Sequence, residues 1–202
     1  MASIRNFFIT ATLISLIGCQ ASPPVENTAV KTEITPVSVT IAESFAYPVG
    51  KTETVTQAKD RDGWYNALEF RENDHLGEDW NKDTGGDTDC GEPVYAIAIG
   101  VITFARDAGP GWGNVVIVEH TLPSGDTVES LYGHLNEILV NSGEVKKRQQ
   151  VGKIGNAGGR YPCHLHFELR TRDCPAWNTA GGGYAAGSSG WVDPSDFIDS
   201  HR

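Results

Sequence analysis

Several histidines and an aspartate in this 202-residue chain have residue types and spacings that suit metal-dependent catalysis. His164 and His166 are two residues apart in a segment typical of a strand, so their imidazoles point to one face about 6.6 Å apart. In an extended chain His75 and Asp79 would be ~13 Å apart, but a bend at Gly77 would bring them together. Imidazole and carboxylate ligands suit Zn²⁺ at about 2.0–2.2 Å, and two His and one Asp with an open position indicate a catalytic site.

His134 and Glu168 are further candidates for this site. Alternation along the strand expected over 127–135 places Val128, Ser130, Tyr132 and His134 on one face, so the His134 ring should end the strand beside Tyr132. A single histidine on a strand is more often structural, but a third one near the His164/His166 pair favours a site. Glu168 shares a face with His166, where it either fixes the tautomer of a ligating ring by a hydrogen bond or forms a surface salt bridge.

Short strands separated by Gly-rich breaks make up most of the chain around these residues. No segment shows a sustained helical pattern, although 136–142 has room for one turn, and Pro123–Asp126 predicts a hairpin turn. This pattern indicates a single all-β domain over residues 45–202. The expected strands are Pro93–Ile99, Gly100–Ala105, Asn114–His120, Thr127–Leu135 and His164–Arg170.

Composition limits the classes of function. With 16 Lys and Arg against 26 Asp and Glu, the chain has a net charge of −10 and no basic patch that would neutralise phosphates. We therefore expect no nucleic-acid partner. Hydrophobic residues make up 39% of the chain, enough for a core, which argues against a wholly disordered protein.

The N-terminus predicts export and a membrane anchor. Residues 1–18 contain an apolar run that is too short to span a bilayer and is typical of a secretory signal. The run ends in Leu16-Ile17-Gly18-Cys19, which resembles the lipobox of bacterial lipoproteins, where Cys19 would be lipidated; the alternative is an ordinary signal peptide. Residues 19–44 are expected to be a tether, with a possible short strand at Val37–Ala42. Gln20 after the cysteine favours the outer membrane, facing the periplasm.

Three further cysteines, Cys90, Cys163 and Cys174, suggest one disulfide in an exported protein. A strand over 164–170 would hold Cys163 and Cys174 much farther apart than the ~7 Å limit between Cα atoms of a disulfide. We therefore expect the pair Cys90–Cys174 first, with the other pairings open.

The ordered set of motifs resembles the lysostaphin-type (LytM-type) zinc metallopeptidases, which cut bacterial cell wall. The resemblance rests on His75-x-x-x-Asp79, on Tyr132-Gly133-His134-Leu135 and on His164-Leu165-His166, and it covers about residues 45–200. The segments Pro93–Val101, Gly113–His120 and Val151–Gly155 also resemble family motifs in the same order.

The resemblance implies residue roles and a fold. Zinc would be bound by His75, Asp79 and His166, while His134 and His164 would be the catalytic pair beside the water that the metal activates; which of the two is the base stays open. The implied fold is a compact antiparallel β-sheet domain, like a duplicated hybrid motif, with an open groove over the zinc. His120 is implied to be a scaffold residue.

The implied function is that of a lipid-anchored zinc endopeptidase, expected to be a monomer, that hydrolyses peptide cross-links of peptidoglycan. Two alternatives are a non-catalytic domain that binds murein or activates an amidase, and the same chemistry on another target. The chain departs from the family pattern at Arg148, which replaces a turn glycine and predicts a different turn geometry. Further departures are the loop Asn156–Cys163 and the polar insertion Asn81–Asp89. None of these touches an expected ligand.

Overall fold

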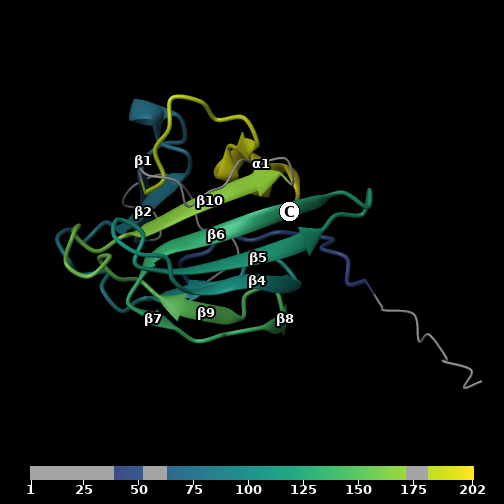
Figure 1. Cartoon of the computed structure of the whole chain (residues 1–202), viewed down its shortest axis with the longest axis horizontal. Helices are drawn as coiled ribbons and strands as arrows, with labels where there is room; N and C mark the ends of the chain where they lie inside the picture. The colour runs from purple at the N-terminus through teal and green to yellow at the C-terminus, as the bar shows by residue number, and fades with distance from the viewer. Residues whose placement is uncertain (1–38, 52–62, 172–181) are drawn as a thin grey trace, which may run out of the picture. The chain divides into compact units, whose positions relative to one another are not determined.

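Residues 39–51, 63–171 and 182–202 are described by the computed structural model, and they form two antiparallel β-sheets. The larger sheet has the order β1-β2-β10-β6-β5-β4-β8, with β11 paired to β10, and the smaller has the order β3-β9-β7 (Figure 1). The predicted all-β antiparallel class is confirmed. The strands are β1 (Trp64–Leu68), β2 (Glu78–Lys82), β3 (Pro93–Tyr95), β4 (Gly100–Asp107), β5 (Asn114–Thr121), β6 (Thr127–Leu135), β7 (Glu137–Ile138), β8 (Gly143–Val145), β9 (Gln150–Lys153), β10 (Leu165–Thr171) and β11 (Trp191–Val192).

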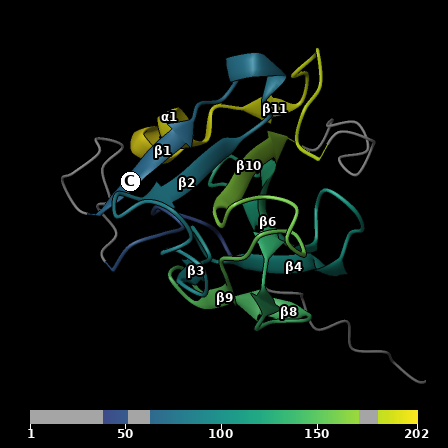
Figure 2. The ribbon, with the colours of Figure 1, turned by 90° about the vertical axis from the view of Figure 1, so that its left-hand side faces the viewer.

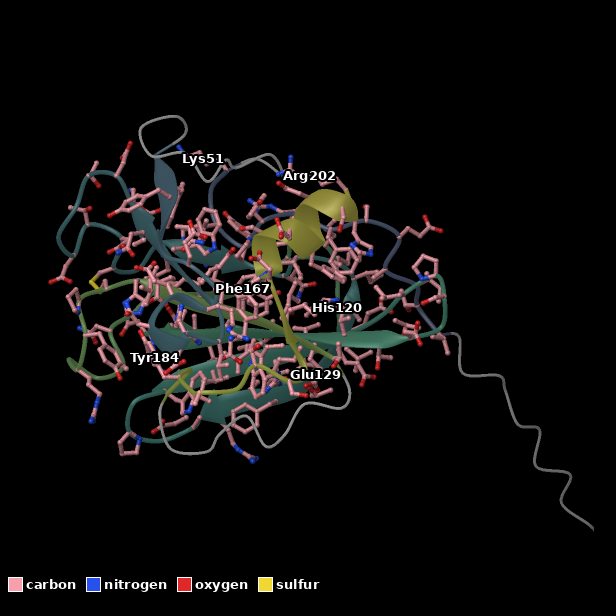
Figure 3. The ribbon with its side chains drawn as sticks, turned by 90° about the horizontal axis from the view of Figure 1, so that it is seen from above. Lys51, His120, Glu129, Phe167, Tyr184 and Arg202 are labelled. Atoms are coloured by element: carbon pink, nitrogen blue, oxygen red, sulfur yellow. A yellow bond between two sulfur atoms is a disulfide. The ribbon has the colours of Figure 1, made fainter. Side chains whose placement is uncertain are left out.

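Strand β10 lies between β2 and β6 (Figure 2). Its side chains alternate between an apolar core and a face that carries polar groups. Leu165, Phe167 and Leu169 are each fully buried in the main core cluster, and Figure 3 labels Phe167 in the interior. His166 and Glu168 alternate with them on the opposite face, as the sequence pattern predicts. Burial of a large apolar side chain contributes roughly 1.5–3 kcal/mol, so these residues fix which face of β10 points inward.

The boundaries of several elements differ from the predictions. The strand expected over 93–99 ends at Tyr95, because the chain then bends with Ala96, Ile97 and Ala98 fully buried. The stretch 136–142, which has room for one helical turn, contains the short strand β7 instead. In the part of Val37–Ala42 that is described, Ile41 forms a single bridge to Thr121 rather than a strand.

A short C-terminal helix, α1 (Pro194–Ser200), has no counterpart in the sequence prediction. Asp193 caps it by accepting a hydrogen bond from the backbone N–H of Asp196. Glu78 of β2 is fully buried beneath this helix, where its carboxylate accepts hydrogen bonds from the Ser195 N–H and from the Trp80 indole. Burial raises the pKa of Glu78 to about 7. Among the described residues no helix is both long and apolar enough to cross a membrane.

The cysteine pairing differs from the prediction. Cys90 is bonded to Cys163 with a Cα–Cα distance of 5.2 Å, so the expected pair Cys90–Cys174 is wrong. The reason is register: Leu165 pairs with Trp80, so the loop that follows β2 returns to the end of β10 where Cys163 lies. Cys174, Cys19 and the expected signal and lipobox lie outside the described residues.

The turn at Arg148 also differs from the prediction, which expected a changed turn geometry there. Its φ of 65° is the left-handed conformation that a glycine would adopt, so the turn keeps its geometry rather than changing it. The Arg148 guanidinium donates hydrogen bonds to the carbonyls of Tyr47, Val49 and Gly50 and lies over the Tyr95 ring. These contacts offset the roughly 1–2 kcal/mol cost of a left-handed residue.

Candidate metal centre and catalytic pair

Two neighbouring strands and the segment before β2 bring three potential ligands together. His166 on β10 lies directly opposite Asp79 on β2 in the antiparallel register. His75 joins them because the chain bends at Leu76 and Gly77, as expected. A Cβ on Gly77 would lie 2.3 Å from the Phe167 carbonyl oxygen, so only glycine allows this approach to β10.

The three ligand atoms converge on one point. His75 Nε2 and His166 Nδ1 are 3.0 Å apart, and Asp79 Oδ1 lies 3.2 Å from the first and 3.1 Å from the second. Two tetrahedral zinc ligands at about 2.0–2.1 Å from the metal are about 3.3 Å from each other, so this spacing fits a zinc ion. Burial opposes ionisation of Asp79, yet hydrogen bonds from His166 and His75 hold the pKa of Asp79 well below its usual range.

Each of the two histidines that could bind the metal, His75 and His166, is oriented through its other ring nitrogen. His75 Nδ1 lies 3.3 Å from the Glu69 carbonyl oxygen, and His166 Nε2 lies 3.0 Å from Glu168 Oε1. Glu168 is fully buried and also accepts a hydrogen bond of 2.8 Å from the Trp191 indole, which excludes the surface salt bridge. With these nitrogens protonated, His75 Nε2 and His166 Nδ1 carry lone pairs for a metal, the arrangement common around zinc.

His134 reaches the site by an irregular backbone. Alternation predicted that it shares a face with Tyr132, but this is wrong: Tyr132 is fully buried in the core, and its hydroxyl accepts a hydrogen bond from the Ile97 N–H. His134 has a φ of 61°, which turns its side chain to the other face of β6. There its Nδ1 is 3.1 Å from the Trp112 carbonyl oxygen, and its ring centroid is 5.4 Å from that of His166.

His164 lies just before β10 and completes the pair. Its ring centroid is 4.8 Å from that of His134, and its Nε2 is 3.7 Å from Asp79 Oδ1. Its Nδ1 lies 2.9 Å from the Pro162 carbonyl oxygen, so Nε2 faces the site. Burial, followed by the charges of His166 and His164, lowers the pKa of His134 to about 3 and makes this imidazole neutral at pH 7. The five side chains expected from the sequence thus lie in one cluster.

The rim contains aromatic residues that the sequence did not single out. The Tyr161 ring lies 4.9 Å from that of His134, and the Tyr184 ring, labelled in Figure 3, lies 5.0 Å from that of His75. Gly183 packs against the His166 ring so closely that a Cβ there would lie 2.4 Å from His166 Cε1. Tyr161 is three residues before His164, so its position in the sequence could have indicated that it lies near the site. Nothing in the Gly-rich stretch around Tyr184 indicates that Tyr184 lies there.

A cavity of about 380 Å³ lies at the end of β6, where Leu135 lines it. It lies between the loop after β4, the residues that follow His134 and the loop after β9, next to the backbone that holds His134. Asp107, Asn114, Asn136 and Asn156 supply polar groups to its wall.

Comparison with known proteins agrees with this geometry. Residues 74–178 match the model of peptidase family M23. The chain is 40% identical over 86 residues to peptidoglycan DD-endopeptidase ShyA of Vibrio cholerae, which is 42% of this chain and 19% of that protein. It is also 40% identical over 81 residues to outer membrane antigenic lipoprotein B of Histophilus somni, which is 40% of this chain and 23% of that protein. The matched region thus spans about a fifth of each relative.

Among solved structures, a zinc-containing peptidase from Vibrio cholerae aligns with a TM-score of 0.47 and 26% identity, over 69% of this chain and 40% of that one. The family match covers more than half of the chain and includes His75, Asp79, His134, His164 and His166. The predicted resemblance is therefore confirmed, and the chain belongs to peptidase family M23.

Proposed function

We propose that this chain is a zinc endopeptidase that hydrolyses peptide cross-links of peptidoglycan. The observation that carries the proposal is the convergence of His75, Asp79 and His166, with ligand atoms 3.0–3.2 Å apart, beside the His134–His164 pair. The name of the similar Vibrio protein, a peptidoglycan DD-endopeptidase, supports the substrate.

His75 Nε2, Asp79 Oδ1 and His166 Nδ1 would hold the metal. A zinc ion bound there would supply a Lewis acid for the scissile carbonyl and would lower the pKa of a water molecule towards about 7. Glu168 and the Glu69 carbonyl keep the two ligating rings in the required tautomer.

His134 and His164 supply the proton transfers. Since Nδ1 of each lies within hydrogen-bonding distance of a backbone carbonyl, each ring presents Nε2 towards the site. One imidazole accepts the proton of the attacking water, and the other, when protonated, stabilises the oxyanion or donates to the leaving amine. The cavity that begins at Leu135, the residue after His134, has room for part of an extended peptide.

The same proposal includes a place in the cell envelope. Residues 1–18 would be a lipoprotein signal, Cys19 would carry the lipid, and residues 19–44 would tether the peptidase domain, 45–202, to the membrane. The name of the similar outer membrane lipoprotein supports an outer-membrane location facing the periplasm. Labelling with a radioactive fatty acid tests the anchor: we expect incorporation into the wild type and none into Cys19→Ala.

Digestion of purified peptidoglycan, followed by mass spectrometry of the muropeptides, tests the activity. We expect cross-linked dimers to decrease and their monomers to accumulate, with about one zinc per chain. In a diderm cell the expected bond is the D-alanyl–diaminopimelate cross-link. A protein that binds peptidoglycan but holds no zinc and releases no monomers would instead be the non-catalytic domain.

A further inference from the structure

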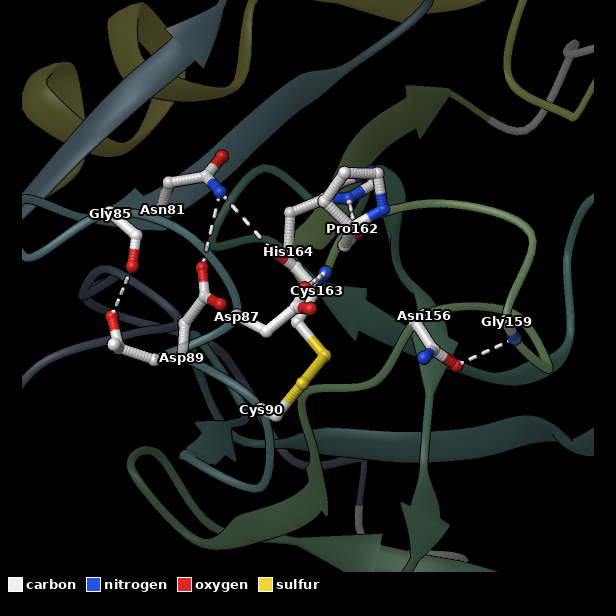
Figure 4. Close-up of a disulfide and its surroundings, with 11 residues drawn as sticks. Asn81, Gly85, Asp87, Asp89, Cys90, Asn156, Gly159, Pro162, Cys163 and His164 are labelled. Carbon is white, nitrogen blue, oxygen red and sulfur yellow. Dashed lines mark hydrogen bonds between the residues drawn. A yellow bond between two sulfur atoms is a disulfide. The ribbon is translucent and has the colours of Figure 1, made fainter.

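The loop between β2 and β3, residues 83–92, is attached to the backbone next to His164. Cys90 in this loop is disulfide-bonded to Cys163, the residue immediately before His164 (Figure 4). Asp87 Oδ1 accepts a hydrogen bond of 2.8 Å from the Cys163 N–H. This loop contains most of the polar insertion that the sequence showed without a role.

Asn81 connects the same backbone to the metal-binding strand. It lies on β2 two residues after Asp79, and its Nδ2 donates to the Cys163 carbonyl oxygen at 3.2 Å and to Asp89 Oδ2 at 3.1 Å (Figure 4). The N–H, the C=O and the side chain of Cys163 are therefore all bound to residues 81–90.

His164 depends on these contacts because it lies outside β10. Its N–H donates to the Gly155 carbonyl at 3.2 Å, and its Nδ1 bonds to the Pro162 carbonyl, which belongs to the same short segment. A shift of the backbone at Cys163 would therefore move the His164 ring. By contrast, His166 is held within β10 by pairing with Gly133 and Asp79.

We propose that Cys90, Asp87 and Asn81 are positioning residues for His164, and that reduction of the Cys90–Cys163 disulfide lowers turnover without releasing the metal. This inference rests on the proposed function, because it assumes that His164 takes part in the reaction. A misplacement of about 1 Å in a catalytic group can cost about 10²-fold in rate.

The reduction can be made with a water-soluble phosphine. The phosphine takes the oxygen atom of one water molecule and gives two electrons to the disulfide, and the two protons of that water give the Cys90 and Cys163 thiols. We expect kcat to fall about 10- to 100-fold after reduction, with KM and zinc content unchanged. The double variant Cys90→Ser/Cys163→Ser should show the same kcat and no further response to the phosphine.

Variants of Asp87 test the positioning role without touching the disulfide. Asp87 is exposed, so Asp87→Ala should fold, and we expect it to lower kcat severalfold while zinc content stays the same. Asp87→Asn keeps an oxygen that can accept from the Cys163 N–H and should restore kcat. Thr84→Ala is the matched control, since the Thr84 hydroxyl bonds to Thr88 within the same loop, and it should behave like the wild type.

A readout besides activity is the NMR signal of the His164 ring in the zinc-loaded protein, assigned by comparison with His164→Gln. We expect it to shift or broaden on reduction and in Asp87→Ala, while the His166 signals stay in place. An unchanged His164 signal together with unchanged kcat would overturn the inference, as would a loss of zinc in proportion to activity. If the wild type hydrolyses no peptidoglycan, the proposed function fails, and the NMR comparison still decides whether the loop positions His164.

Discussion

The proposed metal ligands and the proposed catalytic pair lie in one cluster but are held largely by different kinds of structure. Asp79 and His166 lie opposite each other on paired strands, so the sheet register fixes their separation. His134 has a left-handed backbone, and His164 lies outside any strand, directly after Cys163, which is disulfide-bonded to the loop 83–92. Regular pairing thus places two of the three proposed ligands, and the bend at Leu76 and Gly77 adds His75, whereas irregular backbone places both proposed proton-transfer groups.

The largest effect should come from the strand-held ligands. We expect His166→Ala to lose its zinc and to show no hydrolysis above background, since both the Lewis acid and the activated water would be lost. Elemental analysis measures the zinc content, and release of muropeptides measures the hydrolysis. Treatment of the wild type with a chelator should have the same effect, and added Zn²⁺ should reverse it. Full activity in a zinc-free sample would contradict the metal mechanism.

His134→Ala should show that the proposed catalytic pair can be changed without affecting metal binding. We expect kcat to fall by about 10²–10⁴-fold, the usual contribution of a general acid or base, while zinc content stays equal to that of the wild type. The same two assays apply. Loss of zinc in parallel with activity would show instead that His134 belongs with the ligands.

Glu168→Leu should weaken the metal centre without removing a ligand, because leucine has no oxygen that can accept from His166. The carboxylate accepts a hydrogen bond from His166 Nε2, and losing such a partner typically lowers zinc affinity by about 10- to 100-fold. Competition with a chromogenic chelator measures this affinity. Trp191→Phe, which removes only the donor to Glu168 Oε2, should have a smaller effect, and an equal effect would mean that packing rather than the His166 bond matters.

The smallest effect concerns His120, a buried histidine outside the site, labelled in Figure 3. It lies within hydrogen-bonding distance of the Ile99 carbonyl and the Ser130 hydroxyl, and burial lowers its pKa to about 4 from the usual value of about 6.5. The unfolded chain therefore binds a proton between pH 6.5 and 4 that the folded chain does not, so stability falls as the pH falls through this window.

We expect His120 to lower the free energy of unfolding by about 1 kcal/mol at pH 5.5 relative to pH 8. Urea titrations of the wild type and of His120→Gln at both values measure this, because the other titrating groups cancel in the difference. An equal pH dependence in the two proteins would contradict the depressed pKa.

Among the described residues, the sequence predicted the four longest strands well, β4, β5, β6 and β10, but not β1, β7, β8, β9 or β11. Thr127–Leu135 and the alternation of Leu165, Phe167 and Leu169 matched the structure, because residues buried on one face of a strand repeat with a period of two. Strand β2 was missed because its sequence, Glu78–Lys82, is polar. One face of β2 bears Asp79 of the site, and the other buries the carboxylate of Glu78. The alternation of apolar and polar residues that predicts a strand is therefore absent from its sequence.

For the site, the sequence predicted which residues come together but not how they are arranged in space. The five side chains could be named from their motifs, but the face of His134 could not, since a positive φ at a non-glycine residue interrupts the alternation. The pairing of Cys90 with Cys163 depends on the register of β2 with β10, which no local pattern reveals. Tyr184 and Gly183 reach the site only through the tertiary fold.

Adjacent carboxylates on β2 link the C-terminal helix to the metal centre. Glu78 binds the backbone of Ser195 on one side of the strand, while Asp79 faces the histidines on the other. A chain shortened at Gly190 would leave the Glu78 carboxylate without this partner, at one residue from a ligand. Truncation at the far C-terminus should therefore disturb a centre whose ligands all lie more than twenty residues upstream of the cut.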